Sequence, residues 1–391
     1  MKYNFDEIVD RSYSDSVKYG LRKRLYGTDD VLPLWVADMD FRTPSFIVDA
    51  VKASADHGIY GYTLNPLDFN QAIQDWVKRK YHWDIQTSWI TGCPGVVPSL
   101  VMSILAFTEP QDKIIIQSPV YPPFFSIVTD NNRALLVNEL IESEGRYFMD
   151  FDDLEEKAAL GAKMLILCNP HNPVCRVWNK EELLQLAQIC EKHDIIILTD
   201  DIHADIVFTP HQYIPIASIS DQIAQRTISC FSPSKTFNMA GLATSWAVIS
   251  NPELNKIFRD KLDALHLNNG NYFGPKALSI AYINGDEWLR QAIDYIEKNM
   301  DFVAHYLQKY IPEITMTKPE GTYLIWLNCK GLGMSDQELK SFLIKKAGLG
   351  LIDGTTFGKN GSGYQRINVA CPISILQEAM TKLKNAVELL R

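Results

Sequence analysis

The sequence predicts an α/β fold in which helices cover both faces of a mostly parallel sheet. Five apolar, β-branched runs lack the alternation of half-exposed strands, as expected when both faces of a sheet are buried. Amphipathic helical patterns separate these runs. Beyond Gly285 the order becomes helix–strand–helix–strand–helix, which is typical of a smaller α+β domain. The predicted strands are Lys113–Gln117, Lys163–Cys168, Asp194–Thr199, Thr227–Phe231 and Ser245–Ile249.

The helix between the second and third of these strands has the clearest signals. Asn179 is a candidate N-cap and Glu182 follows three residues later, which is the spacing of a capping box. An apolar stripe then runs from Leu183 to Cys190. A strand, a helix and a strand in this order form a βαβ unit with a parallel strand pair. The same logic predicts a helix over Ser99–Phe107, before the first predicted strand.

The chain divides into three predicted segments. Residues 1–45 are expected to form an N-terminal arm and a segment of the small domain, residues 46–285 the large domain, and residues 286–391 the C-terminal small domain. The elements predicted in the last segment are helices over Trp288–Tyr310, Asp336–Ala347 and Ile375–Leu390 and strands over Thr322–Leu327 and Arg366–Ala370.

The composition is that of a globular protein. Of 391 residues, 46% are hydrophobic and 22% are charged, which excludes a disordered chain. The formal net charge of −9 argues against nonspecific nucleic-acid binding, although it leaves a small anionic ligand open.

No part of the sequence indicates export or a membrane. Charges interrupt the N-terminal MKYNFDEIVDR and no apolar stretch of a signal peptide follows. No apolar run approaches the ~20 residues that span a bilayer. The seven cysteines form no CxxC pair, so we expect neither a disulfide framework nor a zinc site. We therefore expect a cytoplasmic protein without nucleic-acid or membrane partners.

A lysine follows one predicted strand directly. Lys235 lies in Ser-Pro-Ser-Lys-Thr after Thr227–Phe231, and lysine is rarely buried without a task. Burial lowers the pKa of an amine and frees it to form a Schiff base. The hydroxyls of Ser232 and Ser234 beside it suit a phosphate. The alternative is a surface lysine in a turn.

A cluster of acidic residues follows the preceding strand. Asp200 and Asp201, with His203 close by, lie where open α/β sheets bind their ligands. A carboxylate there can hold a ring nitrogen protonated through a charge-assisted hydrogen bond. A helix N-cap is the structural alternative, and a metal site is the weakest of the three hypotheses.

Two further loops carry polar or glycine-rich signals. Asn172 lies in Asn-Pro-His-Asn-Pro, which follows the strand Lys163–Cys168 and is more than a simple turn requires. Gly95, Val96 and Val97 open a helix after a glycine turn, where free backbone N–H groups can cradle a phosphate. This loop is not a Walker A motif, because no GK[ST] follows.

An aromatic and an arginine complete the candidates. Tyr121, between prolines after Lys113–Gln117, suits stacking on a planar ligand, or packing in the core. Arg366 opens Arg-Ile-Asn-Val-Ala and offers a bidentate fork for a carboxylate, or lies on the surface.

Taken together, four of these motifs directly follow predicted parallel strands, where one site would form. They supply an amine, a phosphate cradle, a stacking ring and a carboxylate for a pyridine nitrogen. That inventory matches pyridoxal 5′-phosphate.

The same motifs resemble a known family. TGCPGVVPS, SPVYPPF, NPHNP, DDIHAD, SPSKTFNMAGL and RINVA resemble the fold-type-I pyridoxal-phosphate enzymes of the class I/II aminotransferase superfamily. Within them the chain most resembles the MalY/PatB-type cystathionine β-lyases, or C–S lyases, which Trp35–Phe41 and Tyr60–Thr63 also match. The resemblance implies the PLP-dependent transferase fold, also called aspartate aminotransferase-like.

The resemblance also implies roles for individual residues. Lys235 would carry the cofactor and shuttle the proton, Asp200 would pair with the pyridinium nitrogen, and Tyr121 would stack on the ring. Asn172 would bind the ring hydroxyl oxygen with His203 nearby, and Arg366 would grip the substrate α-carboxylate. The residues implied to hold the phosphate are Gly95, Val96 and Val97, by backbone N–H, and Ser232; Ser234 is also implied to bind the cofactor. Tyr62 would cross into the site of a second subunit, which implies a homodimer.

Three positions depart from the family pattern. Cys175 stands where the family usually has glycine, and it would be strained if the backbone φ there is positive. Asp201 replaces a glutamate, with little expected effect on chemistry. Ala243 stands where many aminotransferase relatives carry a phosphate-binding arginine, which favours the lyase by analogy.

The resemblance implies β-elimination of thiol from cystathionine or a related S-substituted L-cysteine, leaving pyruvate and ammonia. The group that protonates the leaving sulfur stays open between Tyr62 and Tyr121. One alternative is an aminotransferase acting on a small L-amino acid, which shares the early steps. The other is a regulatory role through protein interaction, for which the sequence has no dedicated domain or basic patch.

Overall fold

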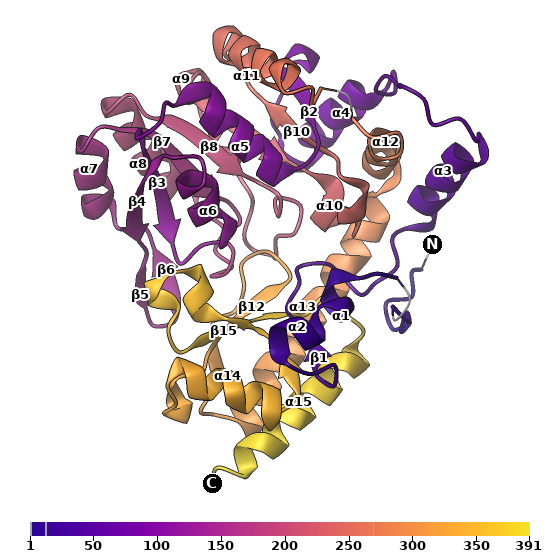
Figure 1. Ribbon diagram of the computed structural model, residues 1–391, viewed down its shortest axis with the longest axis vertical. Helices are drawn as coiled ribbons and strands as arrows, with labels where there is room; N and C mark the ends of the chain where they lie inside the picture. The colour runs from indigo at the N-terminus through magenta and orange to yellow at the C-terminus, as the bar shows by residue number, and fades with distance from the viewer. Residues whose placement is uncertain (1, 12–13, 269) are drawn as a thin grey trace.

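The computed structural model describes residues 2–11, 14–268 and 270–391. Its centre is a seven-stranded sheet in the order β2-β10-β9-β8-β7-β3-β4 (Figure 1). The strands are β2 (Ile90–Cys93), β3 (Lys113–Ser118), β4 (Ala134–Glu139), β7 (Ala162–Cys168), β8 (Ile196–Asp200), β9 (Thr227–Phe231) and β10 (Ser245–Val248). The predicted α/β class and mostly parallel sheet are therefore confirmed.

One predicted strand runs in the opposite direction. Ser245–Ile249 was expected among the parallel strands, but β10 is antiparallel to both β2 and β9. A strand in the middle of a covered sheet is buried on both faces whichever way it runs, so an unbroken apolar run does not reveal its direction. The other neighbours in the sheet are parallel.

Successive residues of the central strands face opposite layers of helices. Ile114 and Ile116 pack in one core with helices α5, α6 and α11, whereas Ile115 packs in the other with α7 and α8. These helices are α5 (Val96–Phe107), α6 (Pro123–Thr129), α7 (Phe151–Ala159), α8 (Lys180–Lys192) and α11 (Pro252–Ala264). The predicted capping box of α8 is present, with Asn179 and Glu182 bonded in both directions.

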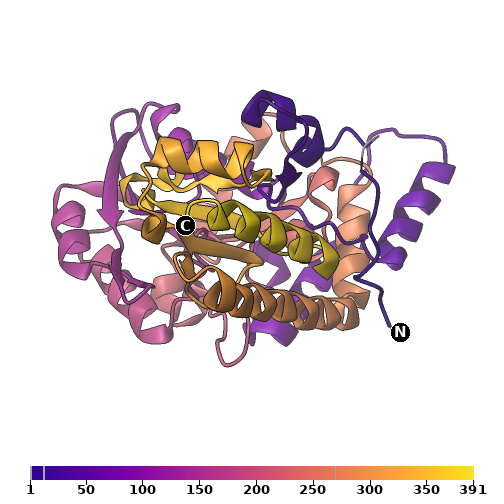
Figure 2. The same cartoon turned by 90° about the horizontal axis from the view of Figure 1, so that it is seen from below.

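The C-terminal part of the chain forms a second sheet of four strands, β11-β12-β15-β14, against long helices (Figure 2). Its elements are α13 (Asp286–Tyr310), β11 (Thr315–Met316), β12 (Leu324–Asn328), α14 (Asp336–Lys345), β14 (Ile352–Asp353), β15 (Tyr364–Asn368) and α15 (Ile373–Glu388). All five elements predicted beyond Gly285 are confirmed, with ends shifted by up to two residues.

The N-terminal segment joins this second unit. β1 (Leu32–Pro33) pairs in parallel with β13 (Leu349–Gly350). The domain boundaries at residues 45 and 285 stay a prediction. The remaining elements are α1 (Val17–Gly20), α2 (Arg22–Tyr26), α3 (Ser45–Asp56), α4 (Phe69–Tyr81), β5 (Ile141–Ser143), β6 (Arg146–Phe148), α9 (Asp221–Ala224), α10 (Pro233–Thr236) and α12 (Gly274–Asn284).

All seven cysteines are buried free thiols. Among the described residues, no helix combines the length and the apolar character needed to cross a membrane.

Candidate active site

The candidate residues gather where strands of the central sheet end. Tyr121 follows β3, Asn172 follows β7, Asp200 ends β8 and Lys235 lies just past β9. Because β9, β8, β7 and β3 are parallel neighbours, their carboxyl ends lie along one edge of the sheet. The expectation that these motifs form one site agrees with this placement.

Lys235 lies on the short helix α10, and its amine is held by a backbone carbonyl. Nζ donates to the carbonyl of Ala37 at 2.5 Å. Burial lowers the pKa of Lys235 to about 8; Asp38 and Asp200 oppose this shift, whereas Arg366 reinforces it. A substantial share of the amine is therefore neutral near pH 8, as a nucleophile and base requires.

Asp200 is a buried carboxylate with unused hydrogen-bonding capacity. Oδ1 accepts the backbone N–H of Ile202 at 3.2 Å. Burial raises the pKa of Asp200 to about 6, against the opposing effects of that N–H group and of Lys235. A protonated ring nitrogen would give the Asp200 carboxylate a cationic hydrogen-bond donor.

Arg366 comes from β15 of the second sheet and reaches across to the central sheet. Nη1 donates to Asn172 Oδ1 at 2.8 Å, and Nη2 donates to the carbonyl of Trp35 at 2.9 Å. The side chain is buried and its Nε atom has no partner among the described residues. Burial lowers the pKa of Arg366 to about 10, so the guanidinium stays charged at neutral pH.

His203 is buried beside Lys235 and Arg366. Its ring lies edge-on to Tyr323 with centroids 5.6 Å apart, and Nδ1 has no partner among the described residues. Burial, reinforced by the charges of Lys235 and Arg366, lowers its pKa well below the usual value for histidine. The imidazole is therefore neutral and has a ring nitrogen to offer a ligand. Asp201 next to Asp200 instead accepts the hydroxyl of Thr199.

The candidate phosphate cradle is the start of α5. Gly95 is its N-cap, so Val96 and Val97 are the first helical residues and their N–H groups have no intrahelical acceptors. A Cβ at Gly95 would lie 3.3 Å from Pro98 Cδ, so a larger residue here would require Pro98 to shift by a few tenths of an ångström. Ser232 caps α10 by accepting the N–H of Ser234 at 3.1 Å.

Ser232 is less available than the sequence suggests. Its hydroxyl donates to the carbonyl of Thr244 at 2.8 Å, so this proton is already used within the chain. Ser234, two residues on, is half-buried.

The two candidate tyrosines have different surroundings. Tyr121 is half-buried, and its pKa is raised by burial and by the nearby Asp200. Tyr62 is fully exposed at 104%, so its side chain is not packed against the buried site residues of its own chain. The structure therefore brings Tyr121 to the site and leaves Tyr62 outside it.

The sequence reasoning missed the backbone of residues 35–38. Carbonyls of Trp35 and Ala37 bind the side chains of Arg366 and Lys235. Only the match of Trp35–Phe41 to a family motif pointed to this segment, and it suggested no role.

Cys175 has the positive φ at which a residue other than glycine is strained. Its φ is 59°, in the left-handed region that favours glycine. Its buried thiol lies 3.4 Å from Thr322 Oγ1 and 3.2 Å from the carbonyl of Leu324.

The chain is similar to known proteins over almost its whole length. The sequence profile of the family "Aminotransferase class I and II" matches residues 29–383. The chain belongs to this family. The cystathionine β-lyase PatB of Bacillus subtilis (strain 168) is 41% identical over 384 residues, covering 98% of this chain and 99% of PatB. Protein MalY of Escherichia coli (strain K12) is 29% identical, and the alignment covers 100% of both chains.

A solved structure extends the similarity to the whole fold. Cystalysin from Treponema denticola, whose crystal structure contains pyridoxal 5′-phosphate, superposes with a TM-score of 0.96 at 36% identity, covering 100% of both chains. The predicted family and the aspartate aminotransferase-like fold are confirmed.

Proposed function

We propose that the protein is a pyridoxal-phosphate-dependent carbon–sulfur β-lyase. It eliminates thiol from cystathionine or a related S-substituted L-cysteine, and water then hydrolyses the remaining three-carbon product to pyruvate and ammonia. The observation that carries the proposal is the amine of Lys235, with its lowered pKa of about 8, within electrostatic reach of both Asp200 and Arg366. The similarity to PatB along 98% of the chain selects the lyase within the family.

The residues present fit the cofactor. The buried Nδ1 of His203 has no partner among the described residues, and the Asp200 carboxylate receives one hydrogen bond, at 3.2 Å. The N-terminus of α5 offers N–H groups to a phosphate. These features leave polar capacity for an aromatic, phosphorylated aldehyde. Lys235 and Asp200 would hold its two ends, and Tyr121 would cover its face.

The chain's own residues perform the proton and binding steps. When bound, the cofactor supplies a protonated ring that accepts the electron pair released at the substrate Cα. Asp200 keeps the proton on the ring nitrogen, and Arg366 binds and orients the substrate α-carboxylate, with Asn172 beside it. Lys235, with its amine neutral, takes the Cα proton of the substrate, and the thiolate then leaves from Cβ.

We further propose that two copies form the working unit. Tyr62 lies in an exposed segment, residues 57–66, that also presents Ile59 at 68% and Leu64 at 91% exposure. Exposed apolar side chains in one segment are typical of an interface, and a second copy would place Tyr62 beside its partner's site. The seven buried free thiols support a location in the reducing cytoplasm.

The test is an absorption spectrum followed by addition of L-cystathionine without a keto acid. We expect the absorption band of the lysine-bound cofactor, with pyruvate and free thiol appearing. Lys235→Ala should lose both, whereas Lys256→Ala, an exposed lysine on α11, should lose neither. Amino transfer to an added keto acid without thiol release would instead indicate an aminotransferase. No band after addition of the cofactor would refute the assignment.

A further inference from the structure

Four consecutive carbonyl groups of residues 35–38, here called the strap, all accept side-chain hydrogen bonds. Each donor belongs to another part of the chain. The bonds are Arg366 Nη2 to Trp35 at 2.9 Å, Asn368 Nδ2 to Val36 at 2.7 Å, Lys235 Nζ to Ala37 at 2.5 Å, Tyr323 OH to Ala37 at 2.7 Å, and Lys18 Nζ and Asn368 Nδ2 to Asp38 at 3.0 and 2.6 Å. The strap therefore fixes both the candidate reactive lysine and the candidate carboxylate-binding arginine.

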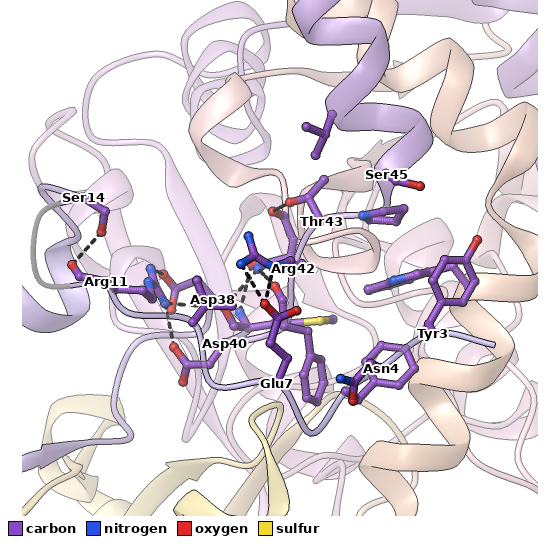
Figure 3. A pocket seen from close by; sticks show the side chains of 18 of the residues that line it. Tyr3, Asn4, Glu7, Arg11, Ser14, Asp38, Asp40, Arg42, Thr43 and Ser45 are labelled. Carbon is purple, nitrogen blue, oxygen red and sulfur yellow. Dashed lines mark hydrogen bonds and ion pairs between the residues drawn. The ribbon is translucent and has the colours of Figure 1, made fainter. Parts of the chain in front are cut away.

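A cluster of four charges, here called the clamp, holds the C-terminal end of the strap. Lys18 Nζ lies 3.1 Å from Asp38 Oδ1 and 2.8 Å from Asp40 Oδ2. Arg11 binds the same two carboxylates at 2.6 and 2.7 Å (Figure 3). Two cations and two anions make the clamp neutral.

Lys18 is the centre of the clamp. Its side chain is 0% exposed, and its amine contacts both the carbonyl and the carboxylate of Asp38 as well as the carboxylate of Asp40. Lysine is almost never fully buried without partners. Removing one member of a buried ion pair leaves an uncompensated charge, so this arrangement resists movement of the strap.

We propose that Lys18 and Asp38 are positioning residues for Lys235, holding the Ala37 carbonyl against its amine and setting the electric field there. The proposal rests on Lys235 being the reactive lysine. An amine that donates one N–H group to a fixed carbonyl has only two positions left for its lone pair, which narrows the direction from which this general base can take a proton.

The charges around Lys235 give the two residues opposite effects. Burial is the main cause of the lowered pKa of Lys235; the anionic Asp38 raises this pKa, whereas the cationic Lys18 lowers it. The charged or titratable groups that face Lys235 or share its carbonyl partner are Asp38, Lys18, Arg366, Asp200, His203 and Tyr323.

The effect is read without cofactor or substrate. The full-length chain, freed of cofactor, is acetylated briefly with trace anhydride at a series of pH values, and mass spectrometry gives the midpoint for Lys235. Lys256, 75% exposed, is the internal reference. Asp38→Asn should lower the midpoint by ~0.5–1 pH unit, and Lys18→Met should raise it by a similar amount. The midpoint of the double variant should lie near that of the chain without substitutions.

A matched control comes from the surface pocket that Arg11, Asp38 and Asp40 of the clamp also line. Glu7 pairs with Arg42 at 2.8 Å and is not part of the clamp, so Glu7→Gln should leave the midpoint unchanged (Figure 3). A merely structural role predicts that Asp38→Asn and Lys18→Met both raise the midpoint, because a loosened site admits water. That outcome, or no shift in either variant, would overturn the proposal.

The design separates folding and function from positioning. Circular dichroism and thermal unfolding verify each variant. If Lys18→Met does not fold, the near-isosteric Asp38→Asn decides by the sign of its shift, and Lys18→Arg should keep the original midpoint. A chain without lyase activity that shows the two opposite shifts would refute the proposed function and leave the positioning intact.

Discussion

Arg366 Nη1 donates to Asn172 Oδ1 at 2.8 Å, joining the second sheet to the loop that follows β7 of the central sheet. The guanidinium is held in place before any substrate arrives, since Nη2 is fixed by Trp35 as well. A carboxylate that binds here meets a donor whose orientation is already set, which reduces the entropy lost on binding.

Arg366→Lys should therefore lower the catalytic efficiency by more than the loss of one ordinary hydrogen bond would. Lysine keeps the charge but cannot bind Asn172, Trp35 and a carboxylate in one plane. We expect kcat/KM to fall by about 10–100-fold, the equivalent of one charge-assisted or two ordinary hydrogen bonds. Steady-state kinetics with L-cystathionine measure it, with the exposed Arg290→Lys as control. An unchanged kcat/KM would place the substrate carboxylate elsewhere.

The pKa of Asp200 predicts how cofactor binding depends on pH. The carboxylate is protonated below about pH 6 in the free chain, and a neutral carboxyl loses its attraction for a protonated ring nitrogen. The affinity for pyridoxal phosphate should decrease as the pH falls through about 6, and this step should disappear in Asp200→Asn. The test is to titrate both proteins with pyridoxal phosphate, followed by fluorescence, over a range of ~3 pH units from about pH 5 to about pH 8, which includes the pKa of Asp200. The same step in both proteins would exclude Asp200 as its source.

Cys175 predicts a reversed ranking of two substitutions. A folded protein is ordinarily less stable with glycine than with alanine at a given position, by ~0.5–1 kcal/mol. At a position with a left-handed backbone, however, alanine is strained by ~1–2 kcal/mol. Cys175, with φ 59°, should therefore give a Cys175→Gly variant that unfolds at higher urea concentration than Cys175→Ala. Cys190, inside helix α8, is the control, where the alanine variant should be the more stable one. The same order at both positions would show that φ does not decide it.

Mixing two inactive variants tests the shared site. Lys235→Ala and Tyr62→Ala should each lose activity alone. In a mixed dimer one site combines an intact Lys235 with an intact Tyr62 from the other subunit. Refolding equal amounts together should restore about a quarter of the original activity, because half of the dimers are mixed and half of their sites are complete. Activity no higher than that of the separate variants would exclude a site shared in this way.

The sheet was predictable where local signals decide it. β9 has the predicted bounds of Thr227–Phe231, and the capping box at Asn179 starts α8 as expected. Strand direction was not, because β10 is set by pairing with β2, whose residues lie more than 150 positions earlier. β12 begins at Leu324 instead of Thr322, whose φ of 70° is not that of a strand.

The site was predictable where residues follow strands of a parallel sheet. Asp200 and Lys235 were located in this way, and the electrostatic interaction between them agrees with one site. Lys18 was not, because a lysine in the four-residue helix α1 (Val17–Gly20) belongs to no apolar stripe that would indicate burial. Only its contacts with Asp38 and Asp40, which no periodicity encodes, set it apart.

The strap also ties the site to the order in which a ribosome makes the chain. Trp35 emerges well before Arg366, which binds its carbonyl and follows 331 positions later. The seven strands of the central sheet are all synthesised before Arg366 and can pair before it appears. A partly made chain can therefore hold Lys235 and Asp200 at the end of a folded sheet before it has the arginine that binds a substrate carboxylate. Competence for turnover is thus reserved for chains whose translation has passed residue 366.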